Sequence, residues 1–288
     1  EVSNEDVRRV IDAAKALAIP MDREVIHILP QEFIIDDQDG IKEPLGMSGV
    51  RLEARVHIVT GAVASAQNII KSCNKAGVDV GDIVLEQLAS SEAVLTPDEK
   101  DLGVALVDIG GGTTEIAVIA LSGIVSDTSI RTGGDELDIS IVQFMRKNYN
   151  LLIGEPTAEQ IKIQIGSAYP VGDEREMEVK GRDLVSGIPK TVRVHSSEIR
   201  EAIQEPIQQI VDAVRRALEI TPPELASDIV DRGIVMTGGG ALIRGLDVLL
   251  SQETGLPIHV DEDPLTCVVR GTGKILDDEE KYWSVLTT

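Results

Sequence analysis

Aromatic residues are scarce in this chain of 288 residues, which has two phenylalanines, three tyrosines and one tryptophan. Few side chains are therefore available to stack on a sugar ring. Cysteine is equally rare: Cys73 and Cys267 stand far apart, with no C-x-x-C spacing. This pattern indicates two unpaired thiols in a reducing compartment and argues against a disulfide framework or a thiolate metal site.

Basic residues are also in short supply. Lysine and arginine number 27 against 49 aspartates and glutamates, a net charge of −22. Such a field repels phosphate backbones and anionic lipid, so we exclude nucleic acid as a partner. No apolar run approaches the roughly 18 residues of a membrane span, and no basic segment precedes an apolar stretch at the start. We therefore expect a cytoplasmic protein.

The remaining composition is that of a folded protein. Hydrophobic residues make up 42% of the chain and charged residues 26%, which is typical of globular domains. The length predicts one large domain or two coupled domains. Because the chain starts at Glu1 without an initiator methionine, we expect a fragment or a processed product.

The first 84 residues predict a compact α+β unit. Ser3 and Asp6 have the spacing of a capping box at the start of a helix. Gly77 is placed to cap the end of the helix at 65–76. The expected order is a helix from Ser3, strands at 25–29 and 33–35 with a bend at Pro30, a solvated turn at 36–40, a strand at 56–60, a helix at 65–76 and a strand at 83–85. His27 and His57 lie within apolar strands and have no second ligand at metal spacing, so we interpret them as structural.

From residue 102 the pattern changes to alternating strands and helices, which favours an α/β fold. We expect strands at 104–107, 116–120, 124–130, 233–236 and 258–260, a hairpin at 177–180 and 190–194, and helices at 134–145, 158–165, from Ser196 through Leu218, after 238–240 and at 264–276.

A glycine triplet, Gly110 to Gly112, joins two of these strands. Consecutive glycines let backbone amides approach anionic oxygens, which suits a phosphate. Asp108 stands at the end of its strand, where a carboxylate could hold hydrated Mg²⁺, and Thr113 and Thr114 could orient a phosphate oxygen or an attacking water. The alternative is a tight hairpin that simply needs glycine. The turn has no GxxxxGK[ST] lysine and is not a P-loop.

A second triplet, Gly238 to Gly240, also follows a strand and precedes an expected helix, whose N-terminal amides could face a nucleotide. One such element is weak evidence. Two strand–triglycine units in one domain predict a nucleotide between them, with one wall for phosphate and one for adenosine.

These motifs resemble those of the actin/Hsp70/sugar-kinase superfamily. VDIGGGTTEIAV (107–118) is similar to its second phosphate motif and TGGGALIRGL (237–246) to its adenosine motif. SIRTGGDELD (129–138), MEVKGRDLVSGIPKTV (177–192) and other segments from about 102 to 288 resemble the bacterial cell-shape family MreB. The resemblance implies an α/β, actin-like (ribonuclease H-like) fold.

Residues 1 to about 101 resemble a different actin-like family, FtsA of bacterial cell division, over its family-specific α+β subdomain. The chain is thus similar to a hybrid of the two. The implied domains are an FtsA-like subdomain (1–84), a nucleotide-binding subdomain (85–134 and 198–262), an MreB-like tip (135–197) and a C-terminal helix and tail (263–288).

The resemblance also implies roles for individual residues. Asp108 would hold Mg²⁺ through water, Glu86 would position the attacking water, and Thr114 would lie beside it as the second catalytic residue. Glu159 and Lys162 would bind the ribose and adenine. Without the resemblance, we would interpret these two residues as a solvated i,i+3 ion pair. The remaining nucleotide-binding residues would be Gly110, Gly111, Gly112, Thr113, Gly133, Gly134, Asp135, Gly238, Gly239, Gly240, Ala241 and Leu242.

The sequence departs from both families because no strand–turn–strand carries their Asp-x-Gly-Thr phosphate motif. No basic amphipathic helix follows the acidic stretch at 277–280, so we expect no direct membrane binding but recruitment to the inner face of the membrane by partners. Three functions remain open: a filament-forming ATPase using ATP/ADP and Mg²⁺, with self-association and with shape or division partners; a scaffold that binds nucleotide without hydrolysis; and a sugar or acetate kinase, for which no substrate aspartate is found.

Overall fold

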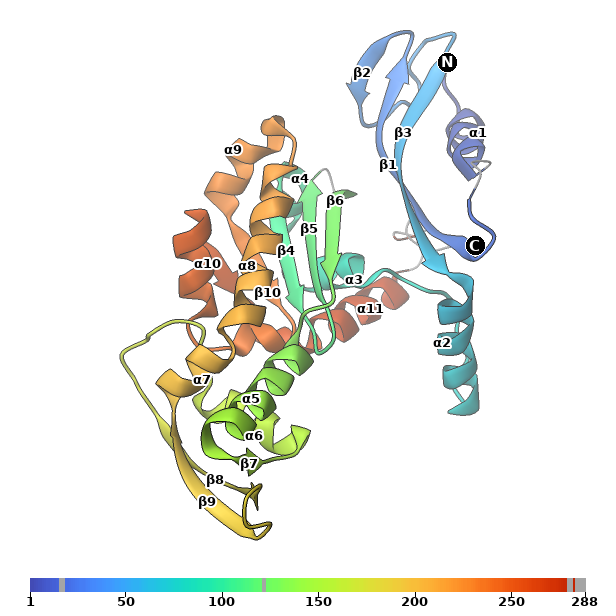
Figure 1. The fold of residues 1–288 in the computed structure, drawn as a ribbon. Helices are drawn as coiled ribbons and strands as arrows, with labels where there is room; N and C mark the ends of the chain where they lie inside the picture. Colours follow the sequence, from blue (N-terminus) through green and yellow to red (C-terminus); the bar gives the residue numbers. More distant parts are fainter. Residues whose placement is uncertain (16–18, 121–122, 279–281, 283–288) are drawn as a thin grey trace. The chain divides into compact units, whose positions relative to one another are not determined.

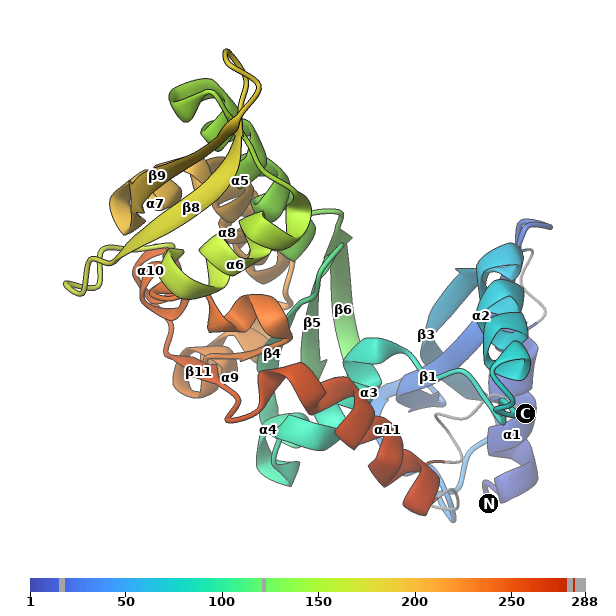
Figure 2. The same cartoon turned by 90° about the horizontal axis from the view of Figure 1, so that it is seen from below.

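The computed structural model describes residues 1–15, 19–120, 123–278 and 282. These residues form two compact units: Glu1–Lys100 with Ala120–Val125 and Val268–Thr288, and Asp101–Ile119 with Ser126–Cys267. Figures 1 and 2 show the ribbon from two directions.

The first unit is built on a three-stranded antiparallel sheet of order β2-β1-β3. Its helix α1 lies along β1 and β3 (Figure 1). Buried Phe33, Ile35 and Ile41 form the core between them, together with Val10 and other apolar residues of α1. The elements are α1 (Asn4–Lys15), β1 (Arg23–Ile35), β2 (Gln38–Ile41), β3 (Leu52–Ala62), α2 (Val63–Lys75), α3 (Glu86–Val94), α4 (Pro97–Leu102) and α11 (Cys267–Asp277).

The start of α1 confirms the capping prediction. The Ser3 N–H donates to Asp6 Oδ2 over 3.0 Å, and the Asp6 N–H donates back to Ser3 Oγ over 3.2 Å. The helix predicted at 65–76 is α2, and Gly77 follows it with φ +80°. His27 is buried and accepts the Leu85 N–H at Nε2 over 2.8 Å, so its imidazole has the predicted structural role.

Two predictions in this unit are wrong. The runs on either side of Pro30 belong to one strand, β1, whose register shifts between Pro30 and Glu32. A bulge absorbs the proline, and β2 pairs only with Phe33 and Ile35, so Pro30 breaks no ladder on that side. The strand predicted at 83–85 has no partner strand among the described residues, and Glu86 is the first residue of α3. A three-residue apolar run carries too little information to specify pairing.

The second unit is an α/β body around a five-stranded sheet of order β11-β10-β4-β5-β6. Every residue of β4 is buried, as are all but one of β5. Its sheet and helices are β4 (Val104–Ile109), β5 (Thr114–Ala120), β6 (Gly123–Ile130), α5 (Gly134–Tyr149), α6 (Glu155–Ile165), α7 (Ser196–Ala202), α8 (Gln204–Glu219), α9 (Pro223–Arg232), β10 (Ile234–Thr237), α10 (Leu246–Thr254) and β11 (Ile258–Val260).

A small second sheet of order β7-β8-β9 lies beside α6 and α7 (Figures 1 and 2). It consists of β7 (Leu151–Leu152), β8 (Glu176–Asp183) and β9 (Pro189–His195). The hairpin β8–β9 is the one predicted from the sequence; β8 is longer by one residue at its start and three at its end, and β9 by one residue at each end.

The helix predicted from Ser196 through Leu218 is broken into α7 and α8 at Ile203. Pro206 explains the break, because its ring cannot donate a hydrogen bond and would clash with the Ala202 carbonyl of a continuous helix. The helix expected directly after the second glycine triplet is instead a short 3₁₀ helix, η1 (Gly239–Leu242). Another 3₁₀ turn, η2 (Pro264–Thr266), precedes α11, and α9 was not predicted.

Candidate functional site

The two glycine triplets follow neighbouring strands of the same sheet. β4 and β10 are parallel and adjacent, with Asp108 opposite Thr237. Asp108 is 2% exposed, and its Oδ2 accepts a hydrogen bond from Thr237 Oγ1 over 2.9 Å. The triplets therefore lie together at the carboxyl edge of the sheet, which is where open α/β sheets bind ligands.

The first triplet forms a turn whose carbonyls are held by the start of α5. The Gly134 N–H donates to the Gly110 carbonyl over 2.9 Å, and the Asp135 N–H donates to the Gly111 carbonyl over 2.8 Å. Gly133 makes this approach possible, since a Cβ there would lie 2.5 Å from the Gly111 oxygen. The contact fixes the turn and leaves its amides for other partners.

The N–H groups of Gly111, Gly112 and Thr113 have no hydrogen-bond partner among the described residues. Gly111 and Gly112 are exposed, and neither has a positive φ. A Cβ on Gly111 would meet only the Asp135 carboxyl, at 3.3 Å, and one on Gly112 would have nothing closer than 4.0 Å. The fold alone does not require glycine at these two positions, which weakens the tight-hairpin alternative. Successive unpaired amides form an anion-binding nest.

The second triplet is packed against the end of β4. Gly238 has φ +79°, and a Cβ there would lie 2.5 Å from Asp108 Oδ1. A Cβ on Gly240 would overlap the Ile109 side chain. Gly239 and Leu242 are exposed, whereas Ala241 is buried. Here glycine is needed for packing, and the exposed members of the turn remain open to a ligand.

α5 and α6 meet beside the first triplet through an ion pair. Lys162 Nζ lies 2.8 Å from Asp138 Oδ2 and 3.0 Å from the Gly134 carbonyl oxygen. Glu159 is exposed, one turn earlier on α6. The sequence suggested Glu159 as the ion-pair partner of Lys162 and did not predict Asp138 as that partner. The available signal was the i,i+4 spacing of Asp138 from Gly134, which places both on one face of α5.

Two carboxyl groups near the site have raised pKa values. Burial raises the pKa of Asp138, opposed by its hydrogen bond from Lys162. Burial also raises the pKa of Glu115, opposed by hydrogen bonds with Thr113 and Ser129. Glu115 faces Asp108 across the β4–β5 ladder, so the two acids stand at one end of the sheet.

The two predicted catalytic residues have different surroundings. Thr114 is fully buried, and its hydroxyl donates to the Thr132 carbonyl over 2.7 Å. Glu86 is the first residue of α3 and belongs to the first unit, whereas Thr114 belongs to the second. The second unit thus brings together Asp108, the two triplets, the start of α5 and Lys162.

The donor set suits magnesium held through water. Among the described residues, no cluster of three or more histidine, cysteine or acidic side chains could hold a metal ion. Mg²⁺ commonly keeps several waters and uses one or two carboxylates together with phosphate oxygens. The Asp108 carboxylate, at the end of β4 that leads into the first glycine turn, is the side chain that could supply such a ligand.

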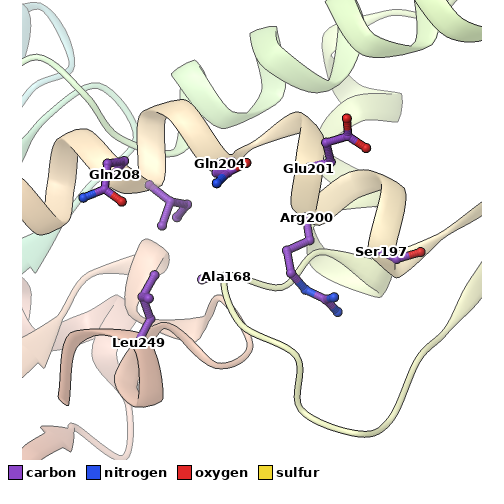
Figure 3. A pocket seen from close by; sticks show the side chains of 8 residues that line it. Ala168, Ser197, Arg200, Glu201, Gln204, Gln208 and Leu249 are labelled. Atoms are coloured by element: carbon purple, nitrogen blue, oxygen red, sulfur yellow. The ribbon is translucent and has the colours of Figure 1, made fainter. Parts of the chain in front are cut away.

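A separate cavity of about 290 Å³ lies in the second unit, between α7, α8 and α10. Figure 3 shows Arg200, Gln204 and Leu249 around it. None of the predicted site residues lines this cavity, so it is distinct from the candidate site.

The sheet order and the paired glycine turns define an actin-like α/β protein. MreB5 of Spiroplasma citri, solved with AMPPNP and with ADP, has this fold: it is 36% identical with a TM-score of 0.72, and the AMPPNP match covers 77% of this chain and 67% of that one. A chain of the PilM–PilN type IV pilus biogenesis complex, 15% identical with a TM-score of 0.60, shares the fold over 94% of this chain and 72% of its own.

Sequence comparison gives the family. The model of the MreB/Mbl proteins matches residues 56–284, and the model of the SHS2 domain inserted in FtsA matches residues 1–60. The cell shape-determining protein MreB of Escherichia coli (strain K12) is 49% identical over 243 residues, which are 83% of this chain and 70% of that protein. The chain belongs to the MreB/Mbl family of bacterial actin-like cell-shape proteins and carries an FtsA-type SHS2 domain at its start.

In the part of the chain that the structure describes, no helix combines the length and the apolar character needed to cross a bilayer.

Proposed function

We propose that the chain binds an adenine nucleotide with Mg²⁺ at the carboxyl edge of β4 and β10. The observation that carries this proposal is the run of three unpaired amides at Gly111, Gly112 and Thr113, in a turn where the fold does not require the two glycines. The nucleotides bound in the Spiroplasma citri structures, AMPPNP and ADP, support the choice of ligand.

In this proposal the two glycine turns bind different parts of the nucleotide. The amides of the first triplet bind the β- and γ-phosphates, and Asp108 holds hydrated Mg²⁺ next to them. Bound Mg²⁺ would neutralise charge on the phosphates. The exposed part of the second triplet, with Leu242, supports the adenosine, and Glu159 contacts the ribose.

We further propose that nucleotide state controls head-to-tail self-association into protofilaments, with the tip segment 135–197 as one contact surface. Other cell-shape or division proteins would be its partners, at the cytoplasmic face of the membrane. Membership of a cell-shape family supports this assignment.

The catalytic proposal is weak hydrolysis, with Glu86 and Thr114 as the two residues assigned to the attacking water. Titration with ATP and Mg²⁺, followed by phosphate release, tests it. Glu86→Ala should lower turnover roughly 100-fold while nucleotide affinity stays unchanged, and Glu136→Gln, on the exposed side of α5, serves as the matched control. Unaltered turnover in Glu86→Ala would remove Glu86 from the reaction.

A second candidate is a scaffold that holds nucleotide without hydrolysing it. The absence of an Asp-x-Gly-Thr phosphate motif from the 288 residues favours it, because a reacting phosphate clamped from one side is poorly positioned. Tight binding without phosphate release would select this function over the ATPase.

A further inference from the structure

The peptide in front of Glu86 is held by a histidine of the first sheet. His27 lies in β1 and is 2% exposed, and its Nε2 accepts the Leu85 N–H over 2.8 Å. The two residues are 58 positions apart, so this bond joins the sheet to the start of α3 within the first unit. The acceptor must be the neutral imidazole, because both nitrogens of the protonated ring are donors.

Leu85 is the N-cap residue of α3, and no side-chain hydrogen bond caps this helix in the described part of the chain. Its carbonyl accepts the Ala89 N–H over 3.1 Å, while its own N–H is bonded to His27. Residues 78–85, which lead into α3, belong to no helix or strand. The bond to His27 is therefore a fixed point at which an irregular segment enters the helix.

The rest of α3 is held by α11. A Cβ on Gly271 would lie 1.6 Å from the Ala89 carbonyl oxygen, so the two helices cross in backbone contact. Towards the end of α3, Lys274 Nζ donates to the Glu92 carbonyl over 2.8 Å. Because the body of the helix is fixed in this way, the direction of its first turn depends on the N-cap peptide, and Glu86 is the first residue of that turn.

Packing alone does not require a histidine at this position. The next residues of the strand, Ile28 and Leu29, are buried and apolar, and a polar ring buried among apolar side chains is unfavourable unless a hydrogen bond compensates it. Leu85 is only half-buried, so water could satisfy its N–H if residue 27 were apolar. The buried imidazole therefore points to a task beyond packing, namely fixing the Leu85 peptide.

We propose that His27 is a positioning residue for the hydrolysis assigned to Glu86: by holding the Leu85 peptide it fixes the first turn of α3, and with it the direction of the Glu86 carboxylate. The inference rests on the proposed ATPase function. His27 lies within the segment that matches the SHS2 model, residues 1–60. The inference thus gives this domain a part in the reaction, a role that the sequence did not indicate.

Turnover tests the coupling between His27 and Glu86. Phosphate release and ADP affinity would be measured for wild type, His27→Leu, His27→Gln, Glu86→Ala, the double variant His27→Leu with Glu86→Ala, and the control His57→Leu, in β3 of the same sheet. His27→Leu removes the acceptor and should lower turnover about tenfold at unchanged ADP affinity, because misplacing a catalytic group by about 1 Å can slow a reaction roughly 100-fold. His27→Gln keeps an acceptor near the Nε2 position and should retain most of the turnover.

The double variant distinguishes positioning from an independent effect. It should turn over no more slowly than Glu86→Ala, because His27 acts only through Glu86. Wild-type turnover in His27→Leu, or a loss that adds to that of Glu86→Ala, would overturn the proposal. Equal losses in His27→Leu and His57→Leu would also overturn it, because both would then come from damage to the sheet.

A further measurement needs no nucleotide and separates this inference from the proposed function. Hydrogen exchange of the Leu85 amide would be followed by NMR, with the Ala76 amide, which donates to the Cys73 carbonyl over 2.9 Å, as the internal reference. Exchange at Leu85 should be slow in wild type and in His27→Gln, and at least about tenfold faster in His27→Leu. Equal rates in the three proteins would refute the positioning role, whether or not ATP is hydrolysed. Absence of phosphate release from wild type, with Leu85 still protected, would reject the ATPase proposal and with it the catalytic task of the His27 contact.

Discussion

Individual glycines in this protein have different structural roles, which the sequence alone does not distinguish. Gly133, Gly238 and Gly240 leave no room for a Cβ against the neighbouring backbone or side chains. Gly112 has room for a Cβ, and a Cβ on Gly111 would require only a small shift of the exposed Asp135 carboxyl; both glycines present unpaired amides. The first group serves packing, and the second is available to a ligand.

This difference predicts opposite phenotypes for two substitutions. Gly111→Val should keep the thermal midpoint within about 2 °C of wild type and abolish ADP binding, because its side chain occupies the place of the phosphate. Gly133→Ala should lower the midpoint by at least about 3 °C, since overpacking costs roughly 1–3 kcal/mol. Calorimetry and ADP titration measure both effects. Gly239→Val, in the second turn, should also lose binding; normal affinity in both Gly111→Val and Gly239→Val would disprove the site.

At the scale of elements, the β8–β9 hairpin is shaped by one acidic residue. Asp183 Oδ1 accepts the N–H groups of Val185 and Ser186 over 2.9 and 2.7 Å, and Asp183 Oδ2 lies 3.3 Å from Lys190 Nζ. The Ser186 backbone hydrogen bond is the main cause that lowers the Asp183 pKa from 3.8 to about 2, followed by the Ser186 hydroxyl. The turn that presents exposed Val185 and Ile188 is therefore held by a carboxylate.

The lowered pKa sets the pH range in which this turn is stable. Because the folded-state pKa is depressed, the stabilisation is complete above pH 4 and is lost as the pH falls towards 2. We expect the amide NMR shifts of Val185 and Ser186 to show no inflection near pH 4 in wild type, and no carboxyl titration of this site in Asp183→Asn. A wild-type inflection close to pH 4 would show that the carboxylate does not hold the turn.

At the scale of the whole molecule, the chain combines segments that match two family models, at residues 1–60 and 56–284. Head-to-tail assembly needs two different complementary surfaces on each copy. Surfaces drawn from two families should fit each other less well, and the net charge of −22 adds repulsion between copies that salt screens.

We therefore expect monomers or short oligomers at low salt, and polymer only with nucleotide, Mg²⁺ and higher ionic strength. Pelleting and light scattering across a salt series measure this, and a matched series without nucleotide is the control. Long filaments at low salt in the absence of nucleotide would contradict the prediction and would mean that the SHS2 segment supplies a compatible surface.

The sequence by itself determined the local features of the protein. Side-chain periodicity and short-range hydrogen bonds specify α1 with its Ser3–Asp6 cap, the strands β4 to β6 and the β8–β9 hairpin, because each depends on residues near in the chain. The two triplets and their family resemblance also predict a ligand site, and that site stays a prediction. Local propensity predicted the wrong structure in two places. Residues 83–85 form no strand because they have no partner strand among the described residues. The helix from Ser196 breaks at Ile203 because the ring of Pro206 would clash with the backbone of a continuous helix.

Only the tertiary structure decided which residues meet. Asp138 and Lys162 are 24 positions apart, and Asp108 and Thr237 are 129 apart, so no local pattern connects them. Whether a glycine is needed for packing or left open to a ligand also depends on atoms brought close by the fold, as Gly133 and Gly111 illustrate. Contacts between distant segments follow from how helices and strands pack, and that packing minimises the free energy of the whole unit rather than of any one segment.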